Sequence, residues 1–298
     1  MVGLLPPPEG ITLEYLGQPS HKVFLQPIFT GAVLLAALRA PEKAEKAIKT
    51  IFGDRIQLPL FVKALKILVA LGVAYRFNNA LNRAALNNFT SDKWDWNKEI
   101  ILITGGSSGF GERMVREFSK RNIKVVVFDL RPPAVPFPPN VHYYTVNVTD
   151  SKTIEDVSNT VKKDIGDPTI LINNAGIVTG KTILGGTEQS VRRTFEVNTI
   201  SHFALIKAFL PAMIRNNHGH IVTLASMASF ATVASNVDYS CSKAAALVFH
   251  EGLAQELRLR YNATRIRTTY VHCPFPRSFL LILMSNTVSS NPSGLAHL

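Results

Sequence analysis

Cysteine is scarce in this chain of 298 residues, which holds only Cys241 and Cys273. Two cysteines cannot form the disulfide framework of a small secreted domain, and so low a number fits a reducing compartment. Cys241 has no acid-base partner of its own in the surrounding motif. We therefore expect it to be a small packing residue and not a nucleophile.

Dense blocks of basic residues are also missing, although the formal net charge is +11. The 32 lysines and arginines are spread over both halves of the chain, and no nucleic-acid-binding motif accompanies them. Such a basic surface suits an anionic membrane or a phosphorylated cofactor better than a nucleic acid. We predict neither a nucleic-acid partner nor a metal site.

The N-terminal part has neither a basic secretory signal nor a long uninterrupted hydrophobic run. Residues 6–22 begin with three prolines and are polar, unlike the start of a signal peptide. The apolar run at residues 23–38 is broken by Gln26 and Pro27, and it falls just short of the roughly 17–25 residues that cross a bilayer comfortably.

A second apolar stretch, residues 58–77, carries Lys63 and Lys66 on one helical face. This pattern is typical of an interfacial amphipathic helix, or of a second hairpin arm whose lysines reach the membrane surface. The alternative is that both apolar stretches pack on the globular domain. Between them, Pro41 begins a charged connecting helix.

An asparagine-rich segment, residues 76–99, is predicted to link this N-terminal part to the next domain. It contains Trp94 and Trp96, which either pack on that domain or lie at a membrane interface. We divide the chain into an N-terminal extension with membrane association (1–97), a dinucleotide-binding catalytic domain (98–272) and an atypical, disordered tail (273–298).

The character of the sequence changes at residues 100–103, a continuous apolar run typical of a buried parallel strand. The loop TGGSSGFG follows, from Thr104 to Gly111, and then a helical pattern begins. Strand, glycine loop and helix in this order let backbone amides at a helix N-terminus approach a pyrophosphate without obstruction by Cβ atoms. The pattern predicts a dinucleotide site.

The second predicted strand, residues 123–128, ends in Asp129. An acid there can accept hydrogen bonds from the adenosine ribose hydroxyls and would repel a 2′-phosphate, which favours NAD(H). Arg131 lies two residues further on and could bind a 2′-phosphate, so NADP(H) stays open. A simple turn role for Asp129 is the alternative.

Two further strands are predicted at residues 141–146 and 169–172. Asp150, after the first, can cap the next helix. The sequence NNAG, residues 173–176, follows the second. Two amides and two small residues at the carboxyl end of a strand suit a ligand crevice, although turn chemistry would also explain them.

A serine, a tyrosine and a lysine are spaced for proton transfer in the second half of the chain. Tyr239 and Lys243 are four residues apart, so they share one face of a helix, and Ser226 precedes them at the end of a predicted strand. A nearby cation lowers the pKa of a phenol, which suits a general acid or base. Alone, a tyrosine and a lysine at this spacing are common and more often mark only the amphipathic start of a helix.

The order and spacing of these motifs resemble the short-chain dehydrogenase/reductase family over roughly residues 98–272. They are TGGSSGFG, Asp129, NVTD, NNAG, Asn198 and the set Ser226, Tyr239 and Lys243. Within the family, the chain resembles the membrane-associated branch of retinol dehydrogenases and 17-beta-hydroxysteroid dehydrogenases. The implied fold is α/β, a doubly wound, Rossmann-like parallel sheet of seven strands, and the alternation of strands and helices supports it independently.

The resemblance implies a role for each matching residue. Tyr239 exchanges the proton, Lys243 lowers the tyrosine pKa and binds the nicotinamide ribose, and Ser226 binds the substrate oxygen. Asn198 kinks its helix and holds a proton-relay water, and Asn173 supports the central strand. The residues expected to bind the cofactor are Thr104, Gly105, Ser107, Gly109, Phe110, Gly111, Asp129, Asp150, Asn174, Ala175, Gly176, Tyr239 and Lys243.

The resemblance breaks after residue 271. The family continues with Pro-Gly and a nearby threonine, whereas Phe275 follows Pro274 here and the threonine is absent. The last strand of the family is missing from the remaining sequence. We expect a truncated or alternatively spliced product, or an incorrect gene model.

The implied function is hydride transfer between NAD(P) and an apolar alcohol or carbonyl compound, such as a retinoid, a steroid or a long-chain lipid. The expected location is a membrane, the endoplasmic reticulum or a lipid droplet, with the catalytic domain facing the cytosol. The family also suggests a homodimer. One alternative is an impaired product that binds dinucleotide or coats a membrane or lipid-droplet surface without turnover. A nucleotide-sugar epimerase is a distant third, because such relatives are longer.

Overall fold

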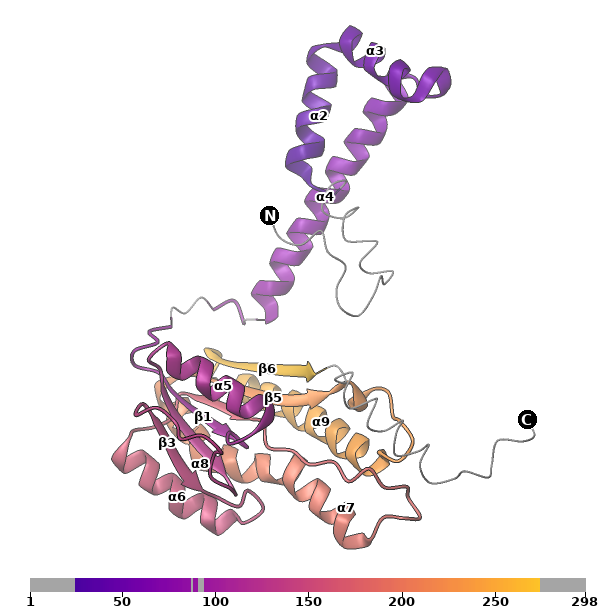
Figure 1. Ribbon diagram of the computed structural model, residues 1–298. Coiled ribbons are helices and arrows are strands. Elements are labelled where there is room, and N and C mark those ends of the chain that lie inside the picture. The colour runs from indigo at the N-terminus through magenta and orange to yellow at the C-terminus, as the bar shows by residue number, and fades with distance from the viewer. Residues whose placement is uncertain (1–24, 87, 91–93, 274–298) are drawn as a thin grey trace, which may run out of the picture. The chain divides into compact units, whose positions relative to one another are not determined.

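The computed structural model describes residues 25–86, 88–90 and 94–273, and the expectations for the start and the tail of the chain lie outside these ranges (Figure 1). Two compact units make up the chain, Met1–Phe89 and Thr90–Leu298. The described residues of the first unit are mainly helical, and those of the second contain a sheet. We describe each unit by itself.

The N-terminal unit is a helical hairpin with a connecting helix. Its helices are α2 (Pro27–Arg39), α3 (Pro41–Phe52) and α4 (Leu58–Leu86). A proline stands in the first turn of α2 and of α3, where its missing N–H has no helical partner in any case. α2 packs along α4, and Gly72 allows the close approach, because a Cβ there would lie 3.0 Å from the carbonyl oxygen of Leu25.

α4 corrects the prediction of a linker that begins at residue 76. The helix continues to Leu86 because alanine, leucine and arginine, which favour helices, alternate with the asparagines. Its segment Leu58–Ala85 is long and apolar enough to cross a membrane, and only 11% of an apolar stretch of 18 residues within it is buried. Segment Glu188–Asn216 is also long and apolar enough, but 56% of its corresponding 18-residue stretch is buried, as expected for a core helix.

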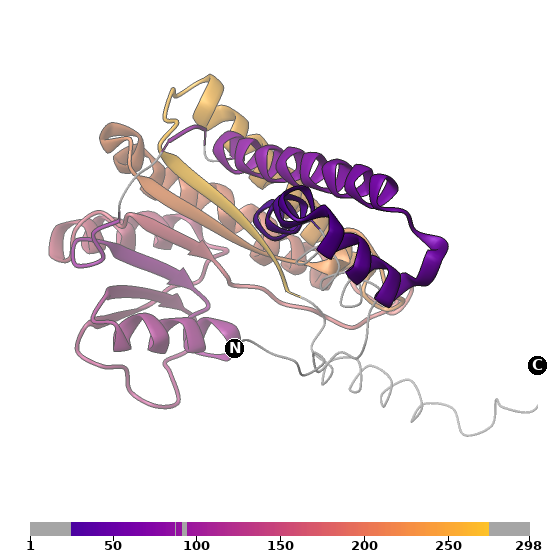
Figure 2. The same cartoon turned by 90° about the horizontal axis from the view of Figure 1, so that it is seen from above.

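The second unit is built on a sheet of six parallel strands among the described residues, in the order β3-β2-β1-β4-β5-β6 (Figures 1 and 2). The strands are β1 (Ile100–Thr104), β2 (Lys124–Asp129), β3 (Val141–Thr145), β4 (Ile170–Asn173), β5 (Gly219–Ser226) and β6 (Ile266–Cys273). The predicted α/β, doubly wound fold is confirmed. The seventh strand that the resemblance implies would follow residue 273, outside the described residues.

Helices cover both faces of this sheet. They are α5 (Gly109–Lys120), α6 (Ser151–Asp164), α7 (Glu188–Phe195), α8 (Ser201–Asn216) and α9 (Val237–Leu259). Leu102 of β1 packs in a core with α6, α8 and α9, whereas its neighbours Ile101 and Ile103 point to the opposite core, beside α5. Trp94 packs against this second core, which decides between the two alternatives for that residue.

The strand order places the predicted site. β1 and β4 are adjacent, and the chain winds outward from them in both directions. In such sheets, ligands bind at the carboxyl ends of the strands where the order reverses. The segments after β1, β4 and β5 therefore define the region where the predicted site residues should meet.

Candidate active site

The glycine-rich loop between β1 and α5 leaves no room for side chains. Gly105 and Gly109 have φ angles of 65° and 58°, in the region that favours glycine. A Cβ at Gly105 would lie 2.9 Å from the Cα of Ala175, and one at Gly111 would overlap the carbonyl oxygen of Gly105. The loop therefore lies against the segment after β4, and the first amides of α5 remain available at the carboxyl edge of the sheet.

Ser107 and Phe110 are the other two residues of this loop that the sequence predicts at the cofactor. Ser107 is 7% exposed, and its Oγ has no hydrogen-bond partner among the described residues. A buried hydroxyl without a partner, next to a helix N-terminus, suits a phosphate oxygen. Phe110 is 53% exposed in the first turn of α5. The shape and the donors of the loop fit a dinucleotide phosphate.

Asp129 joins the end of β2 to the glycine loop. Its Oδ2 accepts a hydrogen bond from the backbone N–H of Ser107 at 2.9 Å, and its Oδ1 accepts one from the N–H of Arg131 at 3.2 Å. The carboxylate lies beside the glycine loop at the end of β2, and a carboxylate there can accept hydrogen bonds from ribose hydroxyls. Arg131 is exposed beside it. This geometry accommodates either NAD(H) or NADP(H).

Thr104 joins β1 to the segment after β4. Its Oγ1 accepts hydrogen bonds from the N–H groups of Asn174 at 3.1 Å and Ala175 at 3.0 Å. The side-chain amide of Asn174 in turn donates to the carbonyl oxygens of Thr104 at 2.8 Å and Gly105 at 3.0 Å. Asn173 is buried below them at the end of β4. These bonds fix the NNAG segment beside the glycine loop.

Asn198 lies in a π-helical turn, Glu196–Ile200, between α7 and α8. Its side chain is fully buried. Oδ1 accepts from the N–H of Ile177 at 2.8 Å, and Nδ2 donates to the carbonyl oxygen of Ile177 and to the Oγ of Ser242, both at 2.9 Å. Asn198 therefore connects the segment after β4 to α9, and the π-turn interrupts the helix at the residue where the resemblance implies a kink.

Tyr239 and Lys243 lie one turn apart near the N-terminus of α9. Lys243 is 4% exposed, and its Nζ donates to the carbonyl oxygen of Leu224 at 2.8 Å. The same Nζ lies 5.9 Å from the centre of the Tyr239 ring. Burial of a cation requires compensation by hydrogen bonds, and the end of β5 supplies one of them.

Ser226 is the last residue of β5 and is 4% exposed. Its Oγ accepts a hydrogen bond from the N–H of Ala228 at 3.1 Å and caps the short helical turn Met227–Ser229. The hydroxyl of Tyr270 shares a hydrogen bond with the Oγ of Ser229 at 2.8 Å, so β6 supports that turn.

Gly176 marks the point where these parts converge. A Cβ at this residue would lie 3.4 Å from Oδ1 of Asn198 and 3.5 Å from Nζ of Lys243. The structure therefore brings the NNAG segment, the π-turn and α9 together at the carboxyl edge of the sheet. A buried cation, a phenol one turn away and a hydrogen-bonded amide network can together move a proton.

Two buried histidines, His202 and His250, lie close enough to interact electrostatically. Burial, with a smaller contribution from the charge of Lys243, lowers the pKa of His202 to about 3. Burial lowers the pKa of His250 to about 4, and its Nδ1 shares a hydrogen bond of 3.0 Å with the Oγ1 of Thr223. Both rings are therefore neutral at physiological pH.

Asp150 caps a helix, and Cys241 lines a small cavity. Asp150 is exposed and caps α6, accepting hydrogen bonds from the N–H groups of Lys152 and Thr153 at 3.0 and 3.3 Å. Hydrogen bonds from Thr153 hold the pKa of this carboxyl below its usual value. Cys241 is exposed and lines a cavity of about 290 Å³ beside α7, so it is not the packing residue that the sequence predicted.

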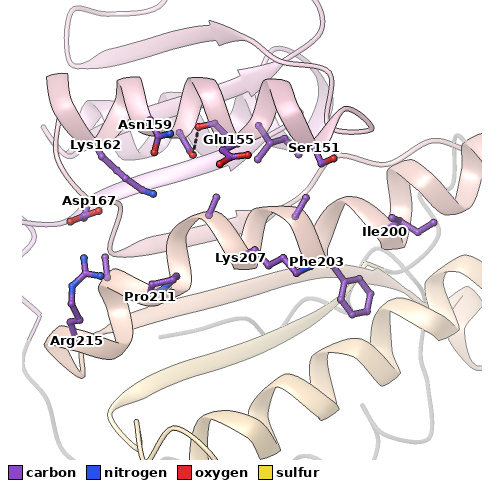
Figure 3. A pocket seen from close by; sticks show the side chains of 15 residues that line it. Ser151, Glu155, Asn159, Lys162, Asp167, Ile200, Phe203, Lys207, Pro211 and Arg215 are labelled. Carbon is purple, nitrogen blue, oxygen red and sulfur yellow. Dashed lines mark hydrogen bonds between the residues drawn. The ribbon is translucent and has the colours of Figure 1, made fainter.

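A cavity of about 590 Å³ lies between α6 and α8. Figure 3 shows Lys162 of α6 and Arg215 of α8 on its walls. It exists because small residues, Ala204, Ala208 and Ala212, line its side on α8. None of the predicted site residues lines this cavity, so its volume does not identify it as the site of the chemistry.

Sequence reasoning missed several residues that support the site. Ser242 bonds both Asn198 and the carbonyl oxygen of Tyr239, the latter at 2.7 Å. Its position directly before Lys243 was the only sequence feature that pointed to this role, and serine is common in the first turns of a helix. His202 and Tyr270 gave no signal, because their roles depend on which helix and strand pack beside α9.

Comparison with known proteins gives a consistent result. A family model described as short chain dehydrogenase matches residues 99–280. Dehydrogenase RED2 of Cochliobolus heterostrophus is 44% identical over 210 residues, which are 70% of this chain and 79% of that protein. Estradiol 17-beta-dehydrogenase 11 of Rattus norvegicus is 38% identical over 184 residues, which are 59% of this chain and 61% of that protein.

A solved structure agrees in fold. It is that of a short chain dehydrogenase from Leptospira borgpetersenii with bound NAD⁺, and its TM-score is 0.57. The alignment covers 62% of this chain and 75% of that one, at 21% sequence identity. At this identity the similarity concerns the fold alone.

Proposed function

The chain belongs to the short chain dehydrogenase family, and on this premise we propose that it transfers a hydride between a nicotinamide dinucleotide and an apolar alcohol or carbonyl compound. The observation that carries the proposal is that the side chains of Asn198 and Lys243 both lie next to Gly176. Lys243 is one helical turn from Tyr239 on α9. A phenol beside a buried ammonium is suited to give and take a proton near neutral pH.

The glycine loop, Ser107 and Asp129 would hold the dinucleotide, whose nicotinamide accepts or supplies the hydride when bound. Asp129 favours NAD(H), because a carboxylate can accept hydrogen bonds from two ribose hydroxyls and repels a 2′-phosphate. Arg131 keeps NADP(H) as the second candidate.

Tyr239 would remove the proton of a substrate hydroxyl, or return it to a carbonyl in the reverse direction. Lys243 would lower the pKa of Tyr239 by its charge, and Ser226 would donate a hydrogen bond to the substrate oxygen. Asn198 would fix the segment after β4 relative to the start of α9. Together with a water molecule, it would also pass the proton to solvent. These roles rest on the hydrogen bonds of Asn198 and Lys243 described above.

An apolar substrate is favoured by the similarity to a protein named estradiol 17-beta-dehydrogenase 11 and by the N-terminal unit. α4 exposes Leu60, Ile67, Leu71, Val73 and Phe77 by 52–65%. A surface of this kind is stabilised by lipid. We place the chain at a membrane, of the endoplasmic reticulum or of a lipid droplet, with the second unit in the cytosol.

A homodimer through α8 and α9 is part of the same proposal. Phe203 of α8 and Val248 of α9 are 51% and 67% exposed, and Phe203 packs edge-on against Phe249. Two adjacent helices with exposed large apolar side chains are suited to pair with a second copy.

The test is a titration of the purified chain with NADH and with NADPH, followed by turnover of retinal and of a steroid ketone. We expect NADH to bind more tightly and at least one apolar carbonyl to be reduced. Binding without turnover of any apolar alcohol or carbonyl would favour a non-catalytic dinucleotide-binding protein. Failure to bind either dinucleotide would overturn the proposal altogether.

A further inference from the structure

The segment between β4 and α7 presents two large aliphatic side chains to solvent at the tip of a turn. Ile183 is 75% exposed and Leu184 is 99% exposed. Large aliphatic side chains are usually buried, and a pair that is exposed at the tip of a turn is a candidate interaction site. Hydride transfer does not require either side chain.

This turn is preformed. The N–H groups of Gly185 and Gly186 donate to the carbonyl oxygen of Thr182 at 3.1 and 2.9 Å, and the Oγ1 of Thr182 accepts a further bond from Gly185 at 3.1 Å. The segment is also tied down at both ends. Thr179 donates to Asp238 of α9 at 2.9 Å, and Thr187 forms a capping box at the start of α7. The hydrogen bonds of Thr182 and of the two ends of the segment therefore fix the conformation in which the tip is exposed.

Exposed apolar side chains gather at the same end of the sheet as this turn. The segments that follow β4 and β5 expose Ile177, Val178, Met227 and Phe230 by 36–63%. In the loops before β1 and β6, Trp96 and Tyr261 are 48% and 45% exposed. The segments at the carboxyl edge of the sheet, where the proposed chemistry lies, therefore carry several exposed apolar side chains besides those of the tip.

The tip suits a lipid surface better than a protein partner. A stable protein interface buries about 800 Å² on each side, which a convex tip of two residues cannot provide. Insertion of two aliphatic side chains among acyl chains needs no complementary surface. Lys181, exposed beside the tip, makes no ion pair with any residue that the structure describes, and its charge complements anionic headgroups.

We propose that Ile183 and Leu184 insert into an anionic lipid surface and turn the catalytic end of the second unit toward it. This inference rests on the proposed membrane association and adds a second contact, independent of α2 and α4. An apolar substrate dissolved in the lipid would then reach the carboxyl edge of the sheet without crossing water.

The test uses the full chain with a tryptophan at the tip, Leu184→Trp, and a second probe, Ile183→Trp. The matched control is Tyr261→Trp, an exposed aromatic position in the loop before β6. Each variant is mixed with vesicles of phosphatidylcholine and phosphatidylserine in which part of the phosphatidylcholine carries bromine on its acyl chains. Wild-type emission from Trp94 and Trp96 is subtracted.

We expect the added emission of both tip variants to shift to the blue and to be lost with brominated lipid, while that of Tyr261→Trp persists. If the wild-type chain floats with the vesicles but the emission of the tip variants is not quenched, this inference alone is overturned. Equal quenching of the Tyr261→Trp control would also overturn it, as would a blue shift that follows protein concentration without lipid, which would indicate a second copy. A wild-type chain that does not float would refute the membrane association first.

Discussion

Asn198 illustrates how much of the candidate site depends on single buried side chains. Its amide bonds the backbone of Ile177 twice and the hydroxyl of Ser242 once, so one residue connects the segment after β4 with α9. Ser242 passes this connection to Tyr239 through the tyrosine carbonyl. A substitution of Ser242 should therefore alter the position of the Tyr239 phenol through these two hydrogen bonds.

Ser242→Ala should lower kcat and the free energy of unfolding, the latter by about 1–3 kcal/mol, because two hydrogen bonds of a buried hydroxyl are removed. The matched control is Ser240→Ala on the same helix. Ser240 is also buried, but its Oγ has no partner among the described residues. Chemical denaturation and steady-state kinetics of the two variants provide the comparison. Equal effects of both substitutions would contradict the role given to Ser242.

Gly111→Ala should abolish dinucleotide binding, because the added methyl group would overlap the carbonyl oxygen of Gly105 and open the loop. Gly252→Ala on α9 adds the same methyl group where no atom lies within 4 Å. This control should bind as the wild type does and gain about 0.5–1 kcal/mol of stability, since alanine is the better helix former. A fluorescence titration with NADH measures both. Tight binding by Gly111→Ala would refute the fit of the loop to a pyrophosphate.

The choice of dinucleotide can be tested at Asp129 and Arg131. Asp129→Ser should narrow the preference for NADH over NADPH, since the repulsion of the 2′-phosphate is removed. Arg131→Ala should leave NADH affinity unchanged. If NADPH affinity collapses in Arg131→Ala while the wild type prefers NADPH, Arg131 is the determinant and the preference assigned to Asp129 is wrong.

The types and the order of the site residues could be predicted from the sequence, because their spacing is local: Tyr239 and Lys243 are one helical turn apart. The hydrogen-bond partners of these residues could not be predicted from the sequence. The partner of Lys243, the carbonyl oxygen of Leu224, is set by how α9 lies across β5, and the exposure of Cys241 is set by what packs beside α9. Such contacts join residues that lie far apart in the sequence and meet only in the folded chain.

At the scale of elements, the strands were the most predictable part. β1, β2 and β4 are short apolar runs followed by loop residues, a pattern typical of buried parallel strands. α4 was less predictable, because asparagines that suggested a linker are accommodated on an exposed helical surface. The π-turn at Asn198 could be expected only from the family resemblance, since no propensity encodes it.

The packing of α8 and α9 on β5 makes stability dependent on pH. Burial lowers the pKa of His202 to about 3 and those of His220 and His250 to about 4, from an ordinary value of 6.5. Between pH 6.5 and 4 the unfolded chain therefore binds more protons than the folded chain, and stability must fall as the pH falls. Above pH 6.5 these rings are neutral in both states and contribute no slope.

We expect the free energy of unfolding to decrease steadily from pH 7 to pH 5 in chemical denaturation experiments. His202→Leu should flatten this dependence, because it removes the ring with the lowest pKa. A stability that is constant or rises toward pH 5 would contradict the burial of these histidines in their neutral form.

At the scale of the whole molecule, the N-terminal unit carries the proposed attachment to a membrane. Val73→Asp places a charge in the middle of the exposed apolar surface of α4, where Val73 is 53% exposed. A charge near the centre of a membrane helix costs about 2.5–3.5 kcal/mol, so binding to vesicles should weaken by roughly 100-fold. Asn78→Asp, on the same helix but at an already polar position, is the control. Flotation with vesicles measures both, and equal binding by Val73→Asp and the wild type would argue against insertion of α4.

The central claim is that Tyr239 exchanges the proton, and the most direct test is the turnover of Tyr239→Phe at saturating NADH and retinal. Removal of one hydroxyl should lower kcat by about 100–10,000-fold while the dissociation constant for NADH stays within about twofold of the wild type. Tyr261→Phe, which changes an exposed tyrosine outside the site, should keep the wild-type rate. A Tyr239→Phe chain that turns over at the wild-type rate would contradict the account.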